Sequence, residues 1–394
     1  MSTAVAILLI LLATPAVVSC VYLLILTILS ASIPTPKPSS RTLRFDVIVP
    51  AHNEAGVIQR TIASLRQLDW PADKFRILVV ADNCNDDTAT LARNSGAEAL
   101  VRNDETRRGK GYALQYAFSS SKKNEWADAV VVIDADAEVS SNLLEAFAAR
   151  IELGAMAVQA HYGVLNTWTS WRTRLITIAK AAFHIVRSRA RERLRVSCGI
   201  RGNGWCVTHE LLDKVPYQAF SLTEDLEYGI TLGQAGYRVH YADEAHSDAE
   251  MVSVEHTARR QRQRWEDGRF QLIRAKTLPL LLHALRQPSK ICLDLALDLM
   301  VLPLSYVVMN VIALLILGVL ATLWNPLFVA STWIAIACCT ALLLHVARGW
   351  QLSGIGIQGL KDLARAPGFL LWKMQLMVKR RESNEWVRTE REKS

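Results

Sequence analysis

The sequence predicts an α/β domain with a mostly parallel sheet, attached to a membrane by one helix before it and two helices after it. Two charge-free stretches, from Met1 to Pro36 and between Asp298 and Arg348, predict the membrane helices. Between them, short apolar runs alternate with helical patterns, which is typical of a parallel sheet covered on both faces. The dense charge of this middle region, together with the apolar ends, excludes a simple soluble enzyme, a polytopic channel and intrinsic disorder.

The first membrane helix is expected over Val5–Leu29. A segment of about 20 apolar residues can cross the hydrocarbon core of a membrane. No basic residue precedes this run and the run is long, so we interpret it as an anchor and not as a cleaved signal peptide. The second charge-free stretch contains two further runs, about Met300–Leu323 and Phe328–Val346, with a turn at Asn325-Pro326 between them.

Basic residues indicate the orientation of these helices. Three of them follow the first run closely, and the loop around Asn325 has no charge. Six more follow the last run: Lys361, Arg365, Lys373, Lys379, Arg380 and Arg381. Because positive charge is enriched on the cytoplasmic side, we expect a multi-pass protein of the cytoplasmic (inner) membrane. Its middle region and C-terminus would lie in the cytosol.

The first half of the middle region, residues 44–150, is predicted to alternate strands with helices. Strands are expected at Phe45–Pro50, Phe75–Ala81, Leu100–Arg102 and Ala129–Ile133, and helices at Ala55–Gln67, Asp87–Asn94 and Gly111–Ser120. Ligands of such sheets bind at the carboxyl ends of the strands. The unusual polar residues fall at those ends, namely His52-Asn53-Glu54, Asp82, and the pair Asp134 and Asp136.

The second half, residues 151–274, is less regular. Trp168–Arg195 carries arginine and aromatic residues at helical spacing, Val196–Thr208 indicates a strand and turn, Leu222–Gly236 a helix, and Tyr237–Tyr241 a short strand. Residues 277–298 predict an amphipathic helix at the membrane interface, before the two spans of residues 299–347. Leu352–Arg381 predicts a second interfacial stretch, within a C-terminal segment of residues 350–394. The N-terminal anchor occupies residues 1–32.

Two groups of carboxylates at strand ends could carry chemistry. Asp134-x-Asp136 follows a buried strand, where two carboxylates can face one hard cation such as Mg²⁺ or Mn²⁺. Its alternative is a solvated turn. Asp82 ends another strand and could accept hydrogen bonds from a nucleobase or ribose, or it could cap the helix that follows.

Four further motifs lie on predicted helices and loops. Lys110 in Arg108-Gly109-Lys110-Gly111 lies at the start of a predicted helix, where it could bind an anion. Glu224 and Asp225 could supply a general base, or they could simply be acidic residues in the first turn of a helix. Arg264 could bind phosphate oxygens and Trp265 could stack on a sugar ring. Alternatively, both belong to a basic helix on the membrane surface. Gly202-Asn203 permits close approach of a ligand, or makes a turn.

The cysteines and the net charge of +8 exclude other classes of site. The seven cysteines include no CxxC pair, so neither a disulfide framework nor a zinc site is expected. No basic patch interleaved with aromatic residues is present, so the excess positive charge is interpreted as facing membrane lipids and not nucleic acid.

Taken together and in this order, the motifs resemble those of membrane-bound family 2 glycosyltransferases, most closely the bacterial enzymes of exopolysaccharide assembly. The matching segments are Pro50–Glu54, Val80–Asp82, Gly109–Gly111, Asp134–Asp136, Thr223–Asp225 and Gln261-x-x-Arg264-Trp265. The narrower likeness rests on Arg201–Gly204, on Leu222–Tyr228 and on Glu385–Thr389 near the C-terminus.

The resemblance implies a GT-A fold, which is Rossmann-like, a UDP-sugar donor, and inversion at the anomeric carbon with Mg²⁺ or Mn²⁺. It implies that Ala51, Glu54 and Asp82 hold uridine, with Lys110 near the base or diphosphate. Asp134 would contact the nucleotide and Asp136 the metal. Asp225 would be the base, beside Glu224. Gln261, Arg264 and Trp265 would close over pyrophosphate and acceptor, near Gly202 and Asn203.

The leading hypothesis is transfer of a sugar to a lipid-linked or polysaccharide acceptor, in exopolysaccharide or cell-surface glycan biosynthesis with other assembly proteins as partners. A processive cellulose-, chitin- or hyaluronan-type synthase and a glycolipid glucosyltransferase are alternatives in the same class. Asp82-Asn83-Cys84 stands where many members have Asp-Asp-Gly, and three spans are fewer than cellulose synthases have. A glycoside hydrolase would leave Asp134, Asp136 and Lys110 unexplained. A non-catalytic scaffold predicts that Asp225 and Arg264 can be replaced without consequence.

Overall fold

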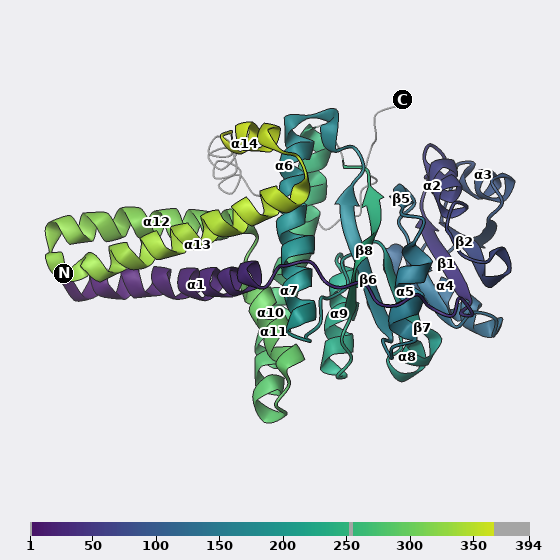
Figure 1. Ribbon diagram of the computed structural model, residues 1–394, viewed down its shortest axis with the longest axis horizontal. Helices are drawn as coiled ribbons and strands as arrows, with labels where there is room; N and C mark the ends of the chain where they lie inside the picture. The colour runs from purple at the N-terminus through teal and green to yellow at the C-terminus, as the bar shows by residue number, and fades with distance from the viewer. Residues whose placement is uncertain (1, 252–254, 366–394) are drawn as a thin grey trace.

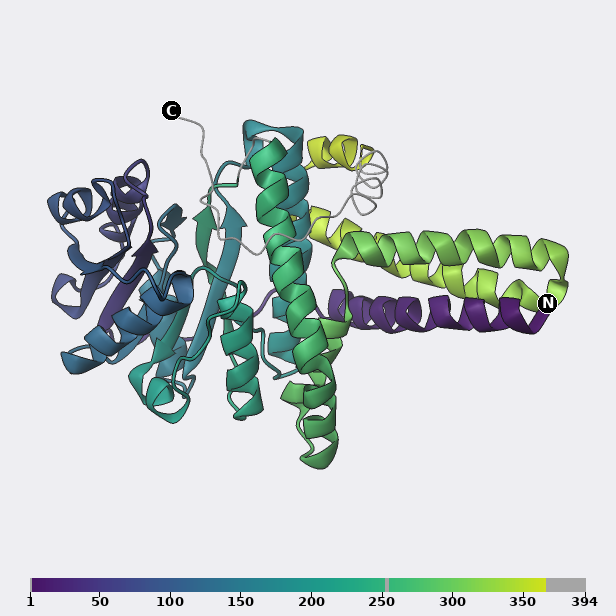
Figure 2. The ribbon, with the colours of Figure 1, turned by 180° about the vertical axis from the view of Figure 1, so that it is seen from behind.

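The computed structural model describes residues 2–251 and 255–365, and it arranges them in three adjoining parts. A bundle of long apolar helices projects from one side, an α/β domain forms the other, and several helices lie between them across the direction of the bundle (Figure 1). The reverse view shows the longest of these intervening helices, α10 (Glu255–Arg286), running over the boundary of the two parts (Figure 2).

The α/β domain is built on an eight-stranded sheet. Its strands are β1 (Phe45–Ala51), β2 (Phe75–Asp82), β3 (Glu98–Arg102), β4 (Ala129–Val132), β5 (Ala137–Val139), β6 (Ala157–Val164), β7 (Trp205–Thr208) and β8 (His240–Ala249). Their order across the sheet is β3-β2-β1-β4-β7-β6-β8-β5. The first four pair in parallel, as predicted. β7 is antiparallel to both β4 and β6, which makes the sheet mixed.

Alternation along β1 explains how both faces of the sheet are buried. Val47 and Val49 face α2 (Ile58–Leu65), α3 (Thr88–Asn94) and α5 (Leu143–Ile151), within one apolar cluster. Ile48 faces the opposite way, with α4 (Lys110–Lys123), α8 (His209–Lys214) and α9 (Glu224–Gln234). Successive side chains of a strand point to opposite faces, so an unbroken apolar run is buried on both.

The projecting bundle consists of α1 (Ser2–Ile28), α12 (Leu304–Trp324) and α13 (Val329–Ser353). Among the described residues, these three helices are long and apolar enough to cross a membrane. They pack on one another through a shared apolar cluster, and a short turn, Pro326–Phe328, joins α12 to α13. The N-terminus lies at the same end of the bundle as this turn, away from the sheet (Figure 1). All three predicted spans are confirmed as helices.

After residue 150, the elements that were not predicted include β6 and α8, and two predicted elements have other bounds. Residues 277–298 do not form one helix, because α10 ends at Arg286 and α11 (Lys290–Met300) begins after Pro288. Proline has no N–H to continue the first helix, and the Ser289 side chain accepts from Cys292 N to start the second. Asp294 and Asp298 are buried and not part of an exposed polar face.

The other departure is β8, which extends past Tyr241 to Ala249 because it pairs along β6 with a register shift at Ala160/His161. The helical spacing over Trp168–Arg195 is confirmed as α6 (Trp171–Lys180), a π-helical turn and α7 (Arg187–Arg193). In the C-terminal segment, α14 (Ile357–Leu363) is described. The remainder of the predicted interfacial stretch, and Glu385–Thr389, lie outside the described residues.

Candidate active site

The loops after β1 and β2 are joined by hydrogen bonds at the carboxyl edge of the sheet. Cys84 Sγ donates to Ala51 O at 3.5 Å, and Glu54 N donates to Thr88 Oγ1 at 2.8 Å. His52 Nδ1 lies 2.7 Å from Asp82 O. The structure therefore brings Ala51, Glu54 and Asp82, predicted to bind the donor, into one group of loops.

Asp82 has a partner that the motifs did not predict. Its Oδ1 lies 2.5 Å from Nη1 of Arg102, at the end of β3, and both side chains are buried. Asn83 Nδ2 also donates to Asp82 Oδ1, at 3.2 Å. The parallel register places Asp82 opposite Arg102. Both residues end strands that the sequence predicts. Their pairing was missed because the order of the strands in the sheet was not predicted.

Lys110 connects three of the predicted motifs. Its Nζ lies 2.6 Å from Asp134 Oδ1, 2.8 Å from Gly202 O and 3.7 Å from Glu224 Oε1. Gly111 makes this approach feasible, because a Cβ there would come within 2.2 Å of Ala219 O. The start of α4 therefore lies directly against the segment that leads into α9.

Asn203 holds the glycine-rich loop, residues 199–204, beside Asp134. The fully buried Asn203 accepts through Oδ1 from Asp134 N and from Ser247 Oγ, both at 3.0 Å. Gly202 has a φ of +92°, and a Cβ on it would lie 3.3 Å from Asp225 Oδ2. Gly202 and Asn203 thus lie between the two predicted carboxylates, Asp134 and Asp225.

The site contains more negative charge than its lysine can balance. Burial raises the pKa of Glu224 to about 7 against the opposing effect of Lys110, and Asp225 and Asp134 raise it further. Burial likewise raises the pKa of Asp225. Lys110 itself has a raised pKa, because the carboxylates outweigh its burial. Like charges held together in this way disfavour ionisation, so a further cation would stabilise the cluster.

The donor chemistry fits a divalent cation that is shared with a bound ligand. Asp136 is partly exposed two residues after Asp134, and carboxylate oxygens suit Mg²⁺ or Mn²⁺. Within the described ranges, no group of three or more His, Cys, Asp or Glu side chains is arranged to hold a metal alone. A cation here would therefore complete its coordination with water or with phosphate oxygens.

Helix α10 covers this site from the side of the bundle. A Cβ on Gly268 would lie 2.7 Å from Thr223 Cγ2, so α10 packs closely on the residue before Glu224. Burial lowers the pKa of Arg264, and the carboxylates of Glu224 and Asp134 oppose this effect. Gln261 is partly exposed and Trp265 is 39% exposed. The three residues predicted to close over the donor and acceptor therefore lie on a helix at the edge of the site.

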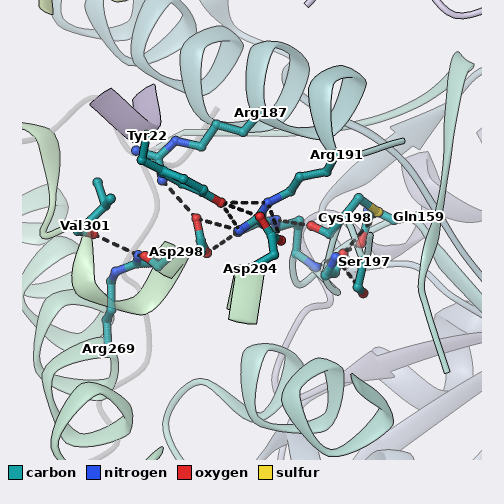
Figure 3. Close-up of polar contacts among 12 residues, drawn as sticks. Tyr22, Gln159, Arg187, Arg191, Ser197, Cys198, Arg269, Asp294, Asp298 and Val301 are labelled. Carbon is teal, nitrogen blue, oxygen red and sulfur yellow. Dashed lines mark hydrogen bonds and ion pairs between the residues drawn. The ribbon is translucent and has the colours of Figure 1, made fainter. Parts of the chain in front are cut away.

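A buried arginine–aspartate cluster, which the motifs did not predict, lies where α7 and α11 face each other (Figure 3). We define it as Arg187, Arg191, Arg201, Arg269, Asp294 and Asp298. Asp298 lies 3.0 Å from Arg191, 3.1 Å from Arg187, 3.9 Å from Arg201 and 4.0 Å from Arg269.

Two contacts extend the cluster to the bundle and to the site. Tyr22 of α1 donates its hydroxyl to Asp294 Oδ1 at 2.9 Å and accepts from Arg191 Nη2 at 2.8 Å. Arg201 immediately precedes Gly202, and its Nε donates to Cys198 O at 3.1 Å. The cluster therefore joins a bundle helix to the loop that contacts Lys110.

Comparison with known proteins bears on this fold and these motifs. A model of the family described as glycosyltransferase like family 2 matches residues 43–268, more than half of the chain. The probable glycosyltransferase YdaM of Bacillus subtilis is 26% identical over 239 residues, which cover 57% of this chain and 55% of that protein. A beta-monoglucosyldiacylglycerol synthase of Synechocystis is 27% identical over 240 residues, covering 57% and 47%. The chain thus spans about half the length of the curated relatives it matches.

A solved structure supports the fold. The mannosyltransferase PcManGT from Pyrobaculum calidifontis, in complex with GDP-Man and Mn²⁺, has a TM-score of 0.51 at 20% identity. The alignment covers 87% of this chain and 98% of that chain. At this identity the likeness concerns the fold, and it confirms the GT-A-like architecture expected from the motifs. With more than half of its residues matching the family model, the chain is a member of glycosyltransferase family 2.

Proposed function

We propose that the chain transfers a sugar from a UDP-sugar to a lipid-linked or polysaccharide acceptor at the cytoplasmic face of the membrane, with inversion, in exopolysaccharide or cell-surface glycan biosynthesis. The observation that carries the proposal is the convergence of Lys110, Asp134 and Glu224 beneath α10. A cluster of carboxylates with one lysine suits a diphosphate with its cation on one side and an acceptor hydroxyl on the other.

The donor would lie across the carboxyl ends of β1, β2 and β4. Ala51, Glu54 and Asp82 would face the nucleoside, and Arg102 would hold the Asp82 carboxylate in place. Asp136, with Asp134, would hold Mg²⁺ or Mn²⁺ against the diphosphate, where the cation neutralises the negative charge that develops on the leaving nucleotide. Lys110 and Arg264 supply positive charge from this chain to the same oxygens.

The acceptor would approach from the side of Gly202 and Asn203, with Trp265 beside it. Asp225 would take the proton of the attacking hydroxyl as the oxygen bonds to the anomeric carbon and the bond from that carbon to the diphosphate breaks. Glu224 contacts Lys110 and would adjust the charge beside the base. Because attack comes from the face opposite the leaving group, the anomeric configuration inverts.

A second acceptor class is supported by one of the relatives. The Synechocystis protein is named for glucosylation of diacylglycerol, so a glycolipid glucosyltransferase remains the alternative to a glycan-assembly enzyme. The Pyrobaculum protein was solved with GDP-Man, so the donor panel should include GDP-mannose. A processive polymer synthase is the third candidate.

The test compares membranes that carry the wild type, Asp225→Asn or Glu210→Gln, each with labelled UDP-sugars or GDP-mannose and Mg²⁺ or Mn²⁺. Glu210 lies on the surface of α8, where it pairs with Lys214, and serves as a matched carboxylate control. We expect organic-phase label from the wild type and the control. Asp225→Asn should lose at least about 100-fold in turnover while still binding UDP-sugar.

The products separate the candidates. Label that enters an ethanol-insoluble pellet and grows with time would identify a polymer synthase. Label on diacylglycerol would identify the glycolipid enzyme. Transfer at the wild-type rate by Asp225→Asn would contradict the assignment of the base, and no transfer from any donor by the wild type would contradict the proposed function.

A further inference from the structure

The basic segment α6–α7 contains arginines that are paired with carboxylates and one lysine, Lys180, that is not paired with any carboxylate of the described residues. Four of its arginines have carboxylate partners. These pairs are Arg174 with Asp362 at 2.5 Å, Arg187 with Asp298 at 3.1 Å, Arg189 with Asp243 at 2.7 Å and Arg191 with Asp294 at 3.1 Å. These arginines therefore hold the fold together. None of the described carboxylates lies within ion-pair distance of Lys180, which is the last residue of α6.

Lys180 is held by neutral groups only. Its Nζ lies 3.1 Å from the centre of the Tyr162 ring and donates to Gly163 O at 3.2 Å. Burial lowers the pKa of Lys180 to about 7, although Asp134, Asp136 and Asp248 act from a distance to raise it. A desolvated ammonium without a counter-ion is unfavourable, so an anion that binds beside it would recover free energy.

Lys180 lines a pocket of about 290 Å³ between β6, β8 and the end of α13. Other lining residues are His161, Thr167, Thr177, His246 and Ser353. The hydroxyls of Thr167, Thr177 and Ser353 already donate to backbone carbonyls. The buried Nδ1 of His161 has no hydrogen-bond partner among the described residues and can therefore donate to an anion. The Asp248 carboxylate also lines the pocket, but it lies 2.9 Å from His246 Nδ1, which balances its charge when that histidine is protonated.

The position of the pocket connects the bundle with the candidate active site. Ser353 is the last residue of α13, at the sheet end of the apolar bundle. On the other side, Tyr162 Cε1 lies 4.0 Å from the place where a Gly202 Cβ would be, and Asp225 Oδ2 lies 3.3 Å from that place. One aromatic ring therefore separates Lys180 from the loop that contacts the candidate base.

We propose that this pocket binds the phosphate ester of a lipid-linked acceptor, with Lys180 as its counter-charge. The lipid chain would run along the bundle from Ser353, and the sugar on the phosphate would pass Tyr162 so that its hydroxyl reaches Asp225. This inference rests on the proposed function, since it names the acceptor class of the same site.

The binding test uses the full chain in a non-ionic detergent with the substitution Asp225→Asn, so that turnover does not obscure affinity. Farnesyl phosphate is the probe, compared with farnesol and inorganic phosphate. We expect farnesyl phosphate to bind best, and Lys180→Gln to weaken its binding about 10- to 100-fold. Lys180→Arg should restore most of the affinity. Lys290→Gln, an exposed lysine at the start of α11, is the matched control and should change nothing.

Several outcomes would overturn the proposal. Equal affinity for farnesol would show that the phosphate is not recognised, and equal affinity for inorganic phosphate would indicate a site for free phosphate. Unchanged binding in Lys180→Gln, with its melting temperature close to that of the parent, would exclude Lys180 as the counter-charge.

Kinetics separate this inference from the proposed function. In the otherwise wild-type chain, Lys180→Gln should raise the KM for a polyprenyl-phosphate-linked sugar about 10- to 100-fold. The control Lys290→Gln should leave this KM and the acceptor-independent hydrolysis of the UDP-sugar unchanged. A wild type that uses only diacylglycerol would overturn the phosphate pocket but preserve the enzyme class. A wild type with neither hydrolysis nor transfer would overturn both.

Discussion

Lys110 is the residue on which the carboxylates of the candidate site converge. It shares its charge between Asp134 at 2.6 Å and Glu224 at 3.7 Å, and it also donates to Gly202 O. A lysine balances only one negative charge, and burial, together with repulsion from neighbouring carboxylates, raises the pKa values of Glu224 and Asp225. We therefore expect the site to gain stability when a cation and a diphosphate enter together.

This arrangement predicts that kcat/KM for transfer falls on the acid side of its pH profile, a decrease that we call the acid limb. A base must be ionised to take a proton, and burial raises the pKa of both Glu224, to about 7, and Asp225. We therefore expect kcat/KM to fall as the pH is lowered into the range where this carboxylate pair takes up a proton, which Glu224 does near pH 7. Glu224→Gln removes a neighbouring negative charge, so the limb should move to lower pH by roughly one unit.

The measurement is a pH profile of kcat/KM at saturating cation for the wild type, Glu224→Gln and Glu210→Gln. Glu210 is an exposed carboxylate on α8, so its removal should leave the limb in place. A limb that stays at the same pH in Glu224→Gln would show that Glu224 does not influence the base.

Helix α11 contributes the charges that hold the parts of the molecule together. Asp298 faces four arginines from α7, α10 and the segment before Gly202. Burial alone would raise the pKa of Asp298, but Arg191, Arg201, Arg269 and Arg187 together hold it well below its usual range. Removing this charge would leave the buried guanidinium groups without their main partner.

Asp298→Asn is therefore expected to destabilise the protein strongly. The loss of one member of a buried ion pair costs about 3–5 kcal/mol, whereas an exposed pair contributes about 0–1 kcal/mol. Thermal unfolding, followed by tryptophan fluorescence, should show a large drop for Asp298→Asn and almost none for Glu210→Gln. Equal melting temperatures for the two variants would contradict a supporting role for the cluster.

The first four strands and the helices between them could be predicted from sequence because each signal is local, whereas β5 and α5 were not predicted. Continuous apolar runs fix β1, β2 and β4, and the polar residues that follow them fall at the edge where ligands bind. The arginine–aspartate cluster could not be predicted, because most partners of Asp294 and Asp298 lie more than 90 residues away in the chain. Beside leucines at helical spacing, these carboxylates indicate an exposed face, and only tertiary contacts reveal their burial.

Tyr162 and Lys180 were missed for a related reason. No strand was predicted over β6, since its residues Ala157–Val164 mix polar and apolar side chains without a clear alternation. Lys180 belongs to a segment rich in cations, and nothing in the spacing distinguishes it from the arginines around it. The arginines differ from Lys180 in having carboxylate partners, and these partners lie on α11, α14 and β8.

The arrangement of the whole molecule bears on its orientation. The bundle of α1, α12 and α13 projects away from the sheet, and the N-terminus and the α12–α13 turn lie together at its far end (Figure 1). If the bundle crosses a membrane, the sheet and this turn must face opposite sides. The described basic residues that follow α1 and α13, such as Lys37 and Lys361, lie at the sheet end and favour the cytoplasmic side for the α/β domain.

Cysteine labelling tests this orientation. Leu327 in the turn is 85% exposed, and the Glu105 side chain in the α/β domain is 86% exposed. In a Cys84→Ser background, a membrane-impermeant maleimide should label Leu327→Cys in intact spheroplasts. It should label Glu105→Cys only after lysis, because the membrane protects the cytosolic side. The background chain is the control for the native cysteines. Labelling of Glu105→Cys before lysis, with Leu327→Cys protected, would show the opposite orientation and would place the candidate site away from cytosolic nucleotide sugars.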